Sequence, residues 1–242
     1  HDPANPHPPA TQTPTAEQKH TPVLTQIATL QKPMIVSTGG GTMEDVNQAY
    51  DAVMPINQQL ALLQCTAGYP AEFKELNLRV ITSFRERFPD SVVGLSSHDN
   101  GIAMAVAAYM LGARIIEKHF TLNHTWKGTD HAFSLEPIGF KKMVRDLQRT
   151  RVAIGDGVKR PYETEVNPII KMGKKIVAAR DLPAGYTLRR EDLALKSPGD
   201  GLAPYEMEKV IGRVTLNPLS EDDDITFDVL NGAQDWSKAA AS

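Results

Sequence analysis

The sequence is poor in the features that mark several classes of protein. Its single cysteine, Cys65, cannot form an internal disulfide, so no oxidising compartment is implied. The longest nearly apolar run, residues 102–113, is too short to span a bilayer. The 26 Lys and Arg against 29 Asp and Glu give a net charge of −3, which indicates neither nucleic acid nor an anionic membrane surface. We therefore expect a cytoplasmic protein with no membrane and no nucleic-acid partner.

What is present is the composition of a globular protein. Hydrophobic residues make up 41% of the 242 residues, enough for one large domain or two small ones. The two ends differ from the rest. Residues 1–20 are rich in Pro, Thr and His without apolar periodicity, and they predict a disordered leader. Residues 231–242 are mostly small or polar and predict a frayed tail.

A regular alternation of short apolar runs and helical patterns begins at Thr21. Each run is continuously apolar, which is typical of strands buried on both faces of a parallel sheet. The pattern predicts four successive βα units within residues 21–154. The expected strands are 33–38, 59–66, 91–98 and 114–121, and the expected helices are 42–54, 77–88, 102–111 and 137–154.

The fold class is therefore α/β, either a doubly wound sheet or half of an eight-stranded (β/α)8 TIM barrel. The strand ends favour the partial barrel. They carry small polar or ligand-type residues, and α/β barrels gather their chemistry at the carboxyl ends of strands. These residues are Ser37, Thr38, Cys65, Thr66, Ser96, Ser97, His98 and His119.

The composition changes after Gly155. Glycine and proline in residues 155–172 predict a linker. Residues 173–230 contain a weak repeat with an interval of 37 residues, which predicts a small domain of two β-rich halves. The repeated apolar positions are Val177, Leu182, Leu188 and Leu193, matched by Val214, Leu219, Ile225 and Leu230.

Two histidines stand out by position. His98 ends the third expected strand, and His119 lies near the end of the fourth. Neighbouring parallel strands would bring both imidazoles to one point. Two imidazoles with open positions suit a divalent metal, and we expect Mn²⁺ or Mg²⁺ rather than structural zinc. The alternative is one buried, hydrogen-bonded histidine and one solvated histidine.

Three further side chains are candidates for the same site. Asp130 lies in a turn-like loop after the fourth strand, where it would bind a polyol or the metal, or only cap a turn or a helix. Tyr69 follows the second strand and would donate a phenolic hydrogen bond or merely cap the strand end. Glu117 shares a strand face with His119, whereas Lys118 points to the other face.

An ordered series of motifs resembles one enzyme family. The series closely resembles the sialic acid synthases, the N-acylneuraminate (9-phosphate) synthase family, and residues 125–137 (TWKGTDHAFSLEP) are more similar to its animal members. Residues 173–230 resemble the family's antifreeze-like (SAF) domain. The motifs are 32–40 (KPMIVSTGG), 62–70 (LLQCTAGYP), 94–98 (GLSSH), 116–121 (IEKHFT), 127–130 (KGTD) and 134–137 (SLEP).

The resemblance implies an activity and roles for particular residues. Phosphoenolpyruvate would condense with N-acetylmannosamine, or its 6-phosphate, to give N-acetylneuraminate or its 9-phosphate. His98 and His119 would hold a divalent metal, typically Mn²⁺. Ser37 and Ser96 would contact the phosphate of phosphoenolpyruvate, Tyr69 would line its site, and Asp130 would contact the mannosamine chain. The family also implies a homodimer in which the SAF domain is swapped.

The departures from the family pattern carry expectations of their own. The family's catalytic glutamate and phosphate-binding lysines have no counterpart in residues 1–20, so no catalytic residue is assigned, and we expect this chain alone to be inactive or nearly so. Ser197 stands where bacterial members place a substrate-reaching arginine. Two alternatives remain: a catalytically inactive interaction or sugar-binding module, and an unrelated metal-dependent hydrolase.

Overall fold

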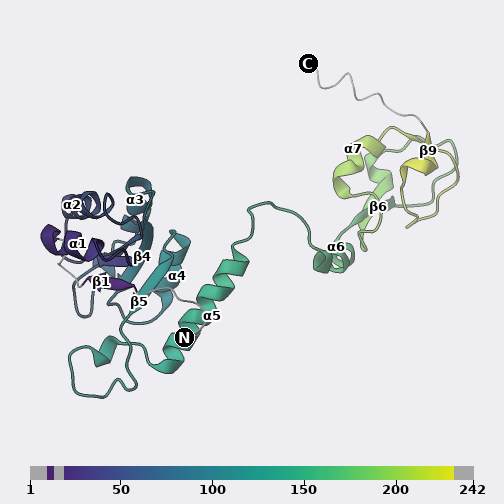
Figure 1. Ribbon diagram of the computed structural model, residues 1–242. Helices are drawn as coiled ribbons and strands as arrows, with labels where there is room; N and C mark the ends of the chain where they lie inside the picture. The colour runs from purple at the N-terminus through teal and green to yellow at the C-terminus, as the bar shows by residue number, and fades with distance from the viewer. Residues whose placement is uncertain (1–9, 14–18, 232–242) are drawn as a thin grey trace, which may run out of the picture. The chain divides into compact units, whose positions relative to one another are not determined.

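The computed structural model describes residues 10–13 and 19–231 (Figure 1). The chain divides into two compact units, residues 1–157 and 158–242, and each is described by itself. Within the described residues, no helix is long and apolar enough to cross a membrane.

The first unit is built on a parallel sheet with the strand order β1-β2-β3-β4-β5. A helix follows each strand, as in a succession of βα units. The strands are β1 (Thr11–Thr13), β2 (Met34–Ser37), β3 (Leu60–Cys65), β4 (Val92–Ser97) and β5 (Ile115–Lys118). The helices are α1 (Thr21–Ala28), α2 (Met43–Val53), α3 (Val80–Arg87), α4 (Ala103–Met110) and α5 (Pro137–Ala153).

The four expected strands and four expected helices are present within a few residues of their expected bounds. The expected count of four units is wrong, because β1 and α1 add a fifth. The prediction of a disordered leader is also wrong for residues 11–13, whose backbone pairs with β2 from Thr11 opposite Met34. This strand reads Thr-Gln-Thr, so no apolar run announces it. The rest of the expected leader, 1–9 and 14–18, lies outside the described residues.

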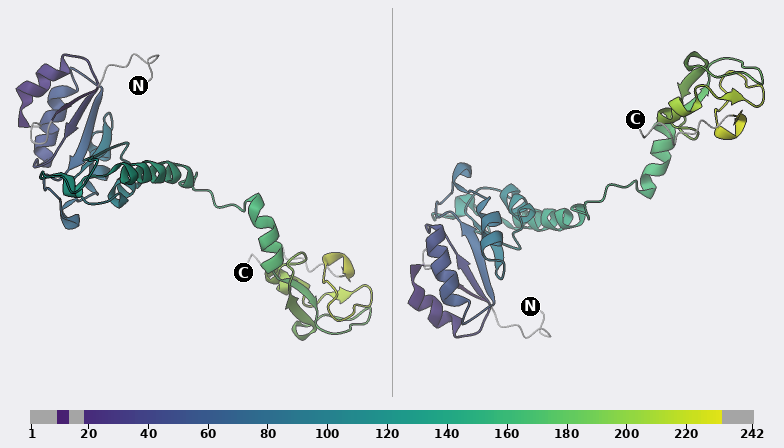
Figure 2. Two further views of the ribbon diagram at one scale, coloured as in Figure 1. Left: turned by 90° about the horizontal axis from the view of Figure 1, so that it is seen from below. Right: turned by 90° about the horizontal axis from the view of Figure 1, so that it is seen from above.

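Helices α1 to α3 cover one face of the sheet and bury its main core (Figure 2). The largest fully buried side chains include Phe84, Leu24 and Leu62, and each such side chain contributes about 1.5–3 kcal/mol. The start of α2 is fixed locally. The Thr42 hydroxyl accepts from the Asp45 N–H at 3.2 Å, and the Asp45 carboxylate accepts from the Thr42 N–H at 2.7 Å. This capping box explains why the helix begins there.

The other face of the sheet is concave and curled. A hydrogen bond from the Gln12 amide to the Glu117 carboxylate joins the two edge strands, β1 and β5, across this face. An apolar groove of about 290 Å³, which includes Ile35, Ala61 and Ile115, lies toward the amino ends of the strands. The curl and the strand order are those of part of a parallel barrel.

The second unit contains two short antiparallel ladders, β6 (Lys175–Ala178) with β7 (Leu193–Lys196) and β8 (Val214–Thr215) with β9 (Leu230–Asn231). Helix α6 (Val166–Met172) precedes them, and α7 (Met207–Val210) lies between the ladders in sequence. The expected linker, 155–172, is therefore partly helical. The tail expected at 231–242 lies outside the described residues, apart from Asn231.

The repeat in this unit is also present in its backbone hydrogen bonds. Leu182 and Leu219, which are 37 residues apart, exchange reciprocal N–H···O bonds of 2.7 and 2.9 Å. The Gly185 N–H donates to the Thr215 carbonyl. In the equivalent bond, the Asp222 N–H donates to the Ala178 carbonyl; Asp222 lies 37 residues after Gly185, and Thr215 lies 37 residues after Ala178. Gly185 and Asp222 both adopt positive φ, at 76° and 77°. The two halves therefore share one backbone design and bury a common core. That core comprises Ile176, Ala178, Leu182, Leu188, Leu193, Val210, Leu219, Ile225 and Leu230.

Candidate functional site

The carboxyl ends of β3, β4 and β5 bring three of the predicted site residues together. The ring centroids of His98 and His119 are 5.1 Å apart, with the ring planes at 81°. Tyr69 stacks on His98 with a centroid distance of 4.1 Å and meets His119 edge-on at 5.8 Å. The three rings thus form one cluster at the edge of the sheet where α/β barrels place their chemistry.

His98 is the buried member of this cluster. Its Nδ1 atom lies 2.8 Å from the carbonyl oxygen of Thr66, which only accepts hydrogen bonds. Nδ1 therefore carries the proton, and the lone pair of Nε2 is free. Burial lowers the pKa of His98 below its ordinary 6.5, only partly offset by this hydrogen bond. Burial thus favours the neutral imidazole, the form that binds metals, and the hydrogen bond to Thr66 fixes its tautomer.

His119 is more open, with 30% of its side chain exposed. Its Nδ1 atom lies 3.6 Å from the Asp130 carboxylate, which is itself about half exposed. The ring of Phe133 lies 5.1 Å from that of His119 and forms an apolar wall. Asp130 therefore reaches the histidine pair from the loop after β5, although it makes no close hydrogen bond to the imidazole.

Tyr69 is held in place through its loop. The Ala71 N–H donates to the backbone carbonyl of His98 at 3.2 Å, which ties the chain after Tyr69 to the end of β4. Half of the Tyr69 residue is exposed, so its ring packs on His98 while another part of it faces solvent. Tyr69 is therefore partly accessible beside the buried His98.

The two predicted phosphate-side serines differ. The Ser96 hydroxyl donates to the Glu117 carboxylate at 2.7 Å, and Glu117 also accepts from Gln12. Ser37 lies on β2, two strands from β4, and its buried hydroxyl has no hydrogen-bond partner among the described residues. Ser96 therefore lies next to the histidine cluster, whereas the Ser37 hydroxyl lies two strands away in the same half-barrel.

Two imidazoles are the candidate ligands for a divalent metal in this cluster. No group of three or more His, Cys, Asp or Glu side chains in the described parts of the chain forms a preformed metal cage. The pair of imidazoles, with a free Nε2 on His98 and a separation of 5.1 Å, fits a metal that keeps its other positions for water or substrate oxygens.

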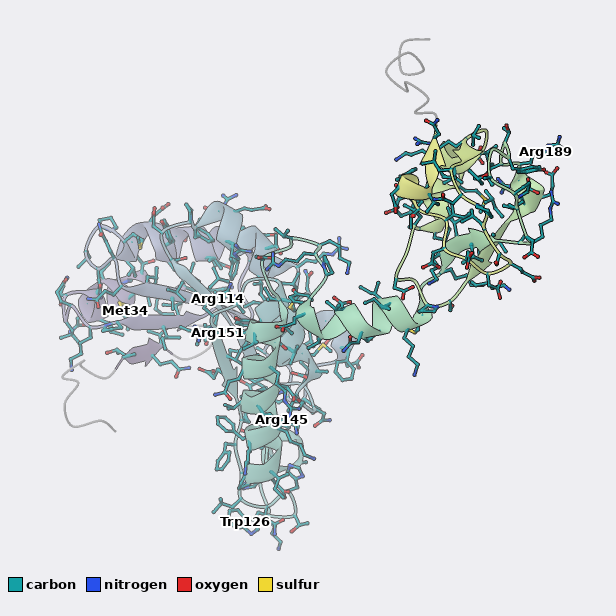
Figure 3. All side chains as sticks on the ribbon, turned by 90° about the vertical axis from the view of Figure 1, so that its right-hand side faces the viewer. Met34, Arg114, Trp126, Arg145, Arg151 and Arg189 are labelled. Atoms are coloured by element: carbon teal, nitrogen blue, oxygen red, sulfur yellow. The ribbon has the colours of Figure 1, made fainter. Side chains whose placement is uncertain are left out.

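The other two histidines of this region have structural contacts. His131 shares a 2.8 Å hydrogen bond with the Thr121 hydroxyl and packs edge-on against Trp126. His124 bonds to the Ser134 carbonyl at 2.6 Å. Trp126, labelled in Figure 3, belongs to the loop that these contacts fold. Contacts of these two histidines thus help to organise the loop that carries Asp130.

Sequence reasoning missed several residues around the site. Gln12 lay in the expected leader, and the Thr66 carbonyl is a backbone group that no side-chain pattern marks. Phe133, which is 3% exposed, had a usable signal in its position three residues after Asp130. Asp99 was missed, and so was its buried ion pair with Lys118, directly next to the two histidines. Their adjacency to His119 and His98 in sequence was the available signal.

Comparison with known proteins identifies the family of the chain. The family model described as the NeuB family matches residues 4–159, and the SAF domain model matches residues 175–230. N-acetylneuraminate-9-phosphate synthase of Mus musculus is 38% identical over 205 residues, covering 84% of this chain and 57% of that protein. The Homo sapiens protein of the same name is 36% identical over 211 residues, covering 87% and 59%. The chain thus spans less than two thirds of the length of these two relatives.

Solved structures agree with this relationship. The spore coat polysaccharide biosynthesis protein SpsE of Bacillus subtilis is 30% identical, with a TM-score of 0.59, over 93% of this chain and 68% of that one. The N-acetylneuraminic acid synthetase of Leptospira borgpetersenii, solved with citrate, is 26% identical, with a TM-score of 0.59, over 66% and 56%. Together with the family model, which matches more than half of the residues, these likenesses show that the chain belongs to the NeuB family and carries a SAF domain.

Proposed function

We propose that the first unit carries the metal-binding and sugar-binding part of a sialic acid synthase. The reaction joins the methylene carbon of phosphoenolpyruvate to the aldehyde carbon of N-acetylmannosamine or its 6-phosphate. Water supplies the new keto oxygen, and inorganic phosphate is released. The observation that carries this proposal is the His98–His119 pair, 5.1 Å apart beside Tyr69 and Asp130, in a chain of the NeuB family.

The two histidines would hold the metal and the neighbouring side chains would orient the sugar. When bound, a divalent ion such as Mn²⁺ or Mg²⁺ supplies Lewis-acid polarisation of an aldehyde oxygen. His98 presents Nε2 because its Nδ1 proton is bound to Thr66. The Asp130 carboxylate, 3.6 Å from His119, accepts hydrogen bonds from sugar hydroxyls. Tyr69 directs its phenol toward phosphoenolpyruvate.

The phosphate side of this site has weaker donors. Ser37 offers a buried hydroxyl that has no partner within the described part of the chain, and Ser96 offers one that is bound to Glu117. Phosphoenolpyruvate is a multiply charged anion, and charged donors bind such groups about twice as strongly as neutral ones. Lys118, the cation nearest in sequence to the histidines, is already bound to Asp99. We therefore infer that this chain alone binds ligands but turns over slowly or not at all.

The assembly and location belong to the same proposal. We propose a homodimer that exchanges the SAF unit, in the cytoplasm. The Ser197 hydroxyl, at the position where bacterial relatives are expected to carry an arginine, donates to the Gly173 carbonyl at 2.8 Å. The neighbouring Lys196 is bound to Asp222. Light scattering of the purified chain gives the oligomeric state, and a monomeric mass would contradict the dimer.

The function is tested by ligand binding and product formation together. Calorimetric titration of the chain with N-acetylmannosamine 6-phosphate in the presence of Mn²⁺ should give saturable binding. N-acetylglucosamine 6-phosphate, which differs at one stereocentre, is the matched control and should bind more weakly. Mass spectrometry should detect little or no nine-carbon keto acid after addition of phosphoenolpyruvate. Failure to distinguish the two sugars would contradict the synthase function, and fast turnover would contradict the inferred inactivity.

A further inference from the structure

A buried ion pair lies directly behind the histidine cluster. The Lys118 ammonium donates to the Asp99 carboxylate at 2.9 Å and to the Asp99 backbone carbonyl at 2.5 Å. Only 2% of the Lys118 side chain and 1% of the Asp99 side chain are exposed. Charges so deeply buried are rarely retained without a partner, because desolvation costs several kcal/mol per ion. Each of the two charges therefore depends on the other for compensation inside the protein.

The position of this pair in the chain links it to both histidines. Asp99 follows His98, and Lys118 precedes His119. Because side chains alternate along a strand, Lys118 points to the opposite face from His119 and Glu117. The Lys118 ammonium thus reaches across from the residue before His119 to the backbone of the residue after His98.

The strand ladder stops before it reaches the histidines. The last paired residues of β4 and β5 are Ser97 and Lys118. His98 and His119 lie one residue further on, outside both strands. Beyond that ladder, the Lys118–Asp99 pair is a direct cross-link between the segments that carry the two imidazoles.

The hydrogen bonds around Asp99 make its carboxylate dependent on the Lys118 ammonium. One carboxylate oxygen accepts from both the Ser97 hydroxyl and the Lys118 ammonium. The other oxygen is buried and has no hydrogen-bond partner among the described residues. Lys118 therefore supplies the charge compensation for this carboxylate. Removal of that ammonium leaves a buried carboxylate without its charge partner, so the segment that carries it is expected to move.

We propose that Lys118 and Asp99 are positioning residues that set the separation of the His98 and His119 imidazoles. Neither touches the metal or a substrate; they act through the backbone next to each histidine. This inference rests on the proposed function for its metal-binding consequence, but the ring separation is a property of the chain alone. A merely stabilising ion pair would affect unfolding without changing the geometry or metal affinity of the folded protein.

Three variants separate these two roles. Lys118→Met keeps the length and apolar stem of the side chain but removes the ammonium. Lys118→Arg keeps a cation that can still reach the carboxylate. Lys118→Met combined with Asp99→Asn removes both charges. We expect this double variant to be more stable than Lys118→Met alone, although the ionic cross-link is still absent. The control is Asp192→Asn, which breaks a buried carboxylate–arginine pair in the second unit.

Each folded variant is measured by Mn²⁺ titration, followed by electron paramagnetic resonance, and by its crystal structure. For Lys118→Met and the double variant, we expect Mn²⁺ affinity to fall about 10-fold or more, as for other groups that orient metal ligands. The centroid distance should also depart from 5.1 Å by about 1 Å, a displacement large enough to impair a site. Lys118→Arg should recover most of the affinity, and Asp192→Asn should leave both values unchanged.

Two results would overturn the proposal. One is a folded double variant with the unaltered ring separation and affinity, which would make the pair only a stabilising contact. The other is that Lys118→Met unfolds while the double variant keeps the Mn²⁺ affinity and the ring separation of the unchanged chain. If the unchanged chain binds no Mn²⁺, the proposed metal function fails, and the ring separation in the variant crystals still decides whether the pair positions the histidines.

Discussion

His98 donates from Nδ1 to the backbone carbonyl of Thr66 over 2.8 Å, and this single contact fixes which nitrogen of the imidazole is free. Because the carbonyl belongs to the end of the neighbouring strand, the tautomer is set by the sheet itself. The buried ring presents Nε2 with little freedom to rotate. Such orientation of a metal ligand by a backbone acceptor is common in metal sites.

The first prediction concerns the two histidines. His98→Gln and His119→Gln should each weaken Mn²⁺ binding by about a hundredfold or more, because each removes one of two protein ligands. Electron paramagnetic resonance of free Mn²⁺ measures the affinity. His124→Gln is the control, since that imidazole bonds to the Ser134 carbonyl in the loop. Equal loss in all three variants would point to general destabilisation instead of a two-histidine site.

The second prediction concerns Tyr69. Tyr69→Phe keeps the ring stacked on His98, so we expect only the loss of one hydrogen bond to phosphoenolpyruvate, about a 3- to 10-fold weaker affinity. Tyr69→Ala also removes the 4.1 Å ring contact and should cost more. Calorimetry with phosphoenolpyruvate distinguishes the two. Identical affinities for all three proteins would show that Tyr69 only covers the strand end.

A third prediction tests the close approach of strands in the half-barrel. A Cβ added to Gly94 would lie 2.4 Å from a Leu63 methyl and 2.5 Å from the Ile115 carbonyl oxygen. Backbone must therefore move, and Gly94→Ala should lower the free energy of unfolding by about 1–3 kcal/mol. Gly139→Ala in α5 is the control, because its nearest contact would be 3.4 Å from Leu135. Chemical unfolding should show Gly139→Ala unchanged or slightly more stable.

The fourth prediction concerns pH and the second unit. Burial alone would raise the pKa of Asp192, but hydrogen bonds from the Arg189 N–H and the Arg180 guanidinium outweigh it and hold the pKa below its ordinary 3.8. The unfolded state therefore binds more protons in the window below 3.8. The stabilising effect is complete above that pH and is lost as pH falls through the folded value.

Asp192→Asn should thus lower the free energy of unfolding of the second unit by about 1–2 kcal/mol at neutral pH and flatten its loss in acid. Urea unfolding between pH 2.5 and 7, followed by amide signals of residues 175–230, measures both. Glu191→Gln is the matched control, because that exposed carboxylate lies 3.9 Å from Arg189. An unchanged acid slope in Asp192→Asn would contradict this assignment.

The strands and helices that depend on apolar patterning were predictable from the sequence. The run Leu-Ala-Leu-Leu-Gln-Cys is β3 with every residue buried, and Thr42 starts a helix through its own capping box. The repeat at 37 residues predicted paired halves, and Leu182 bonds its counterpart Leu219. In each case the local sequence and the tertiary packing favour the same structure.

Features that depend on distant partners were not predictable. The strand at Thr11–Thr13 is polar and exists because β2 offers an unpaired edge. Spacing placed His98 and His119 near each other, but the Thr66 carbonyl that fixes one tautomer is visible only in the folded chain. The contact of Lys118 with Asp99 likewise needs the geometry of two strand ends.

The central claim is that His98 and His119 together bind a divalent metal at the carboxyl ends of β4 and β5. Anomalous diffraction at the manganese edge, from crystals of the chain grown with Mn²⁺, tests it most directly. We predict one strong peak between the two rings, bonded to Nε2 of His98 and to a ring nitrogen of His119. Saturating Mn²⁺ with no peak at these imidazoles, or a peak bound by neither histidine, would contradict the account.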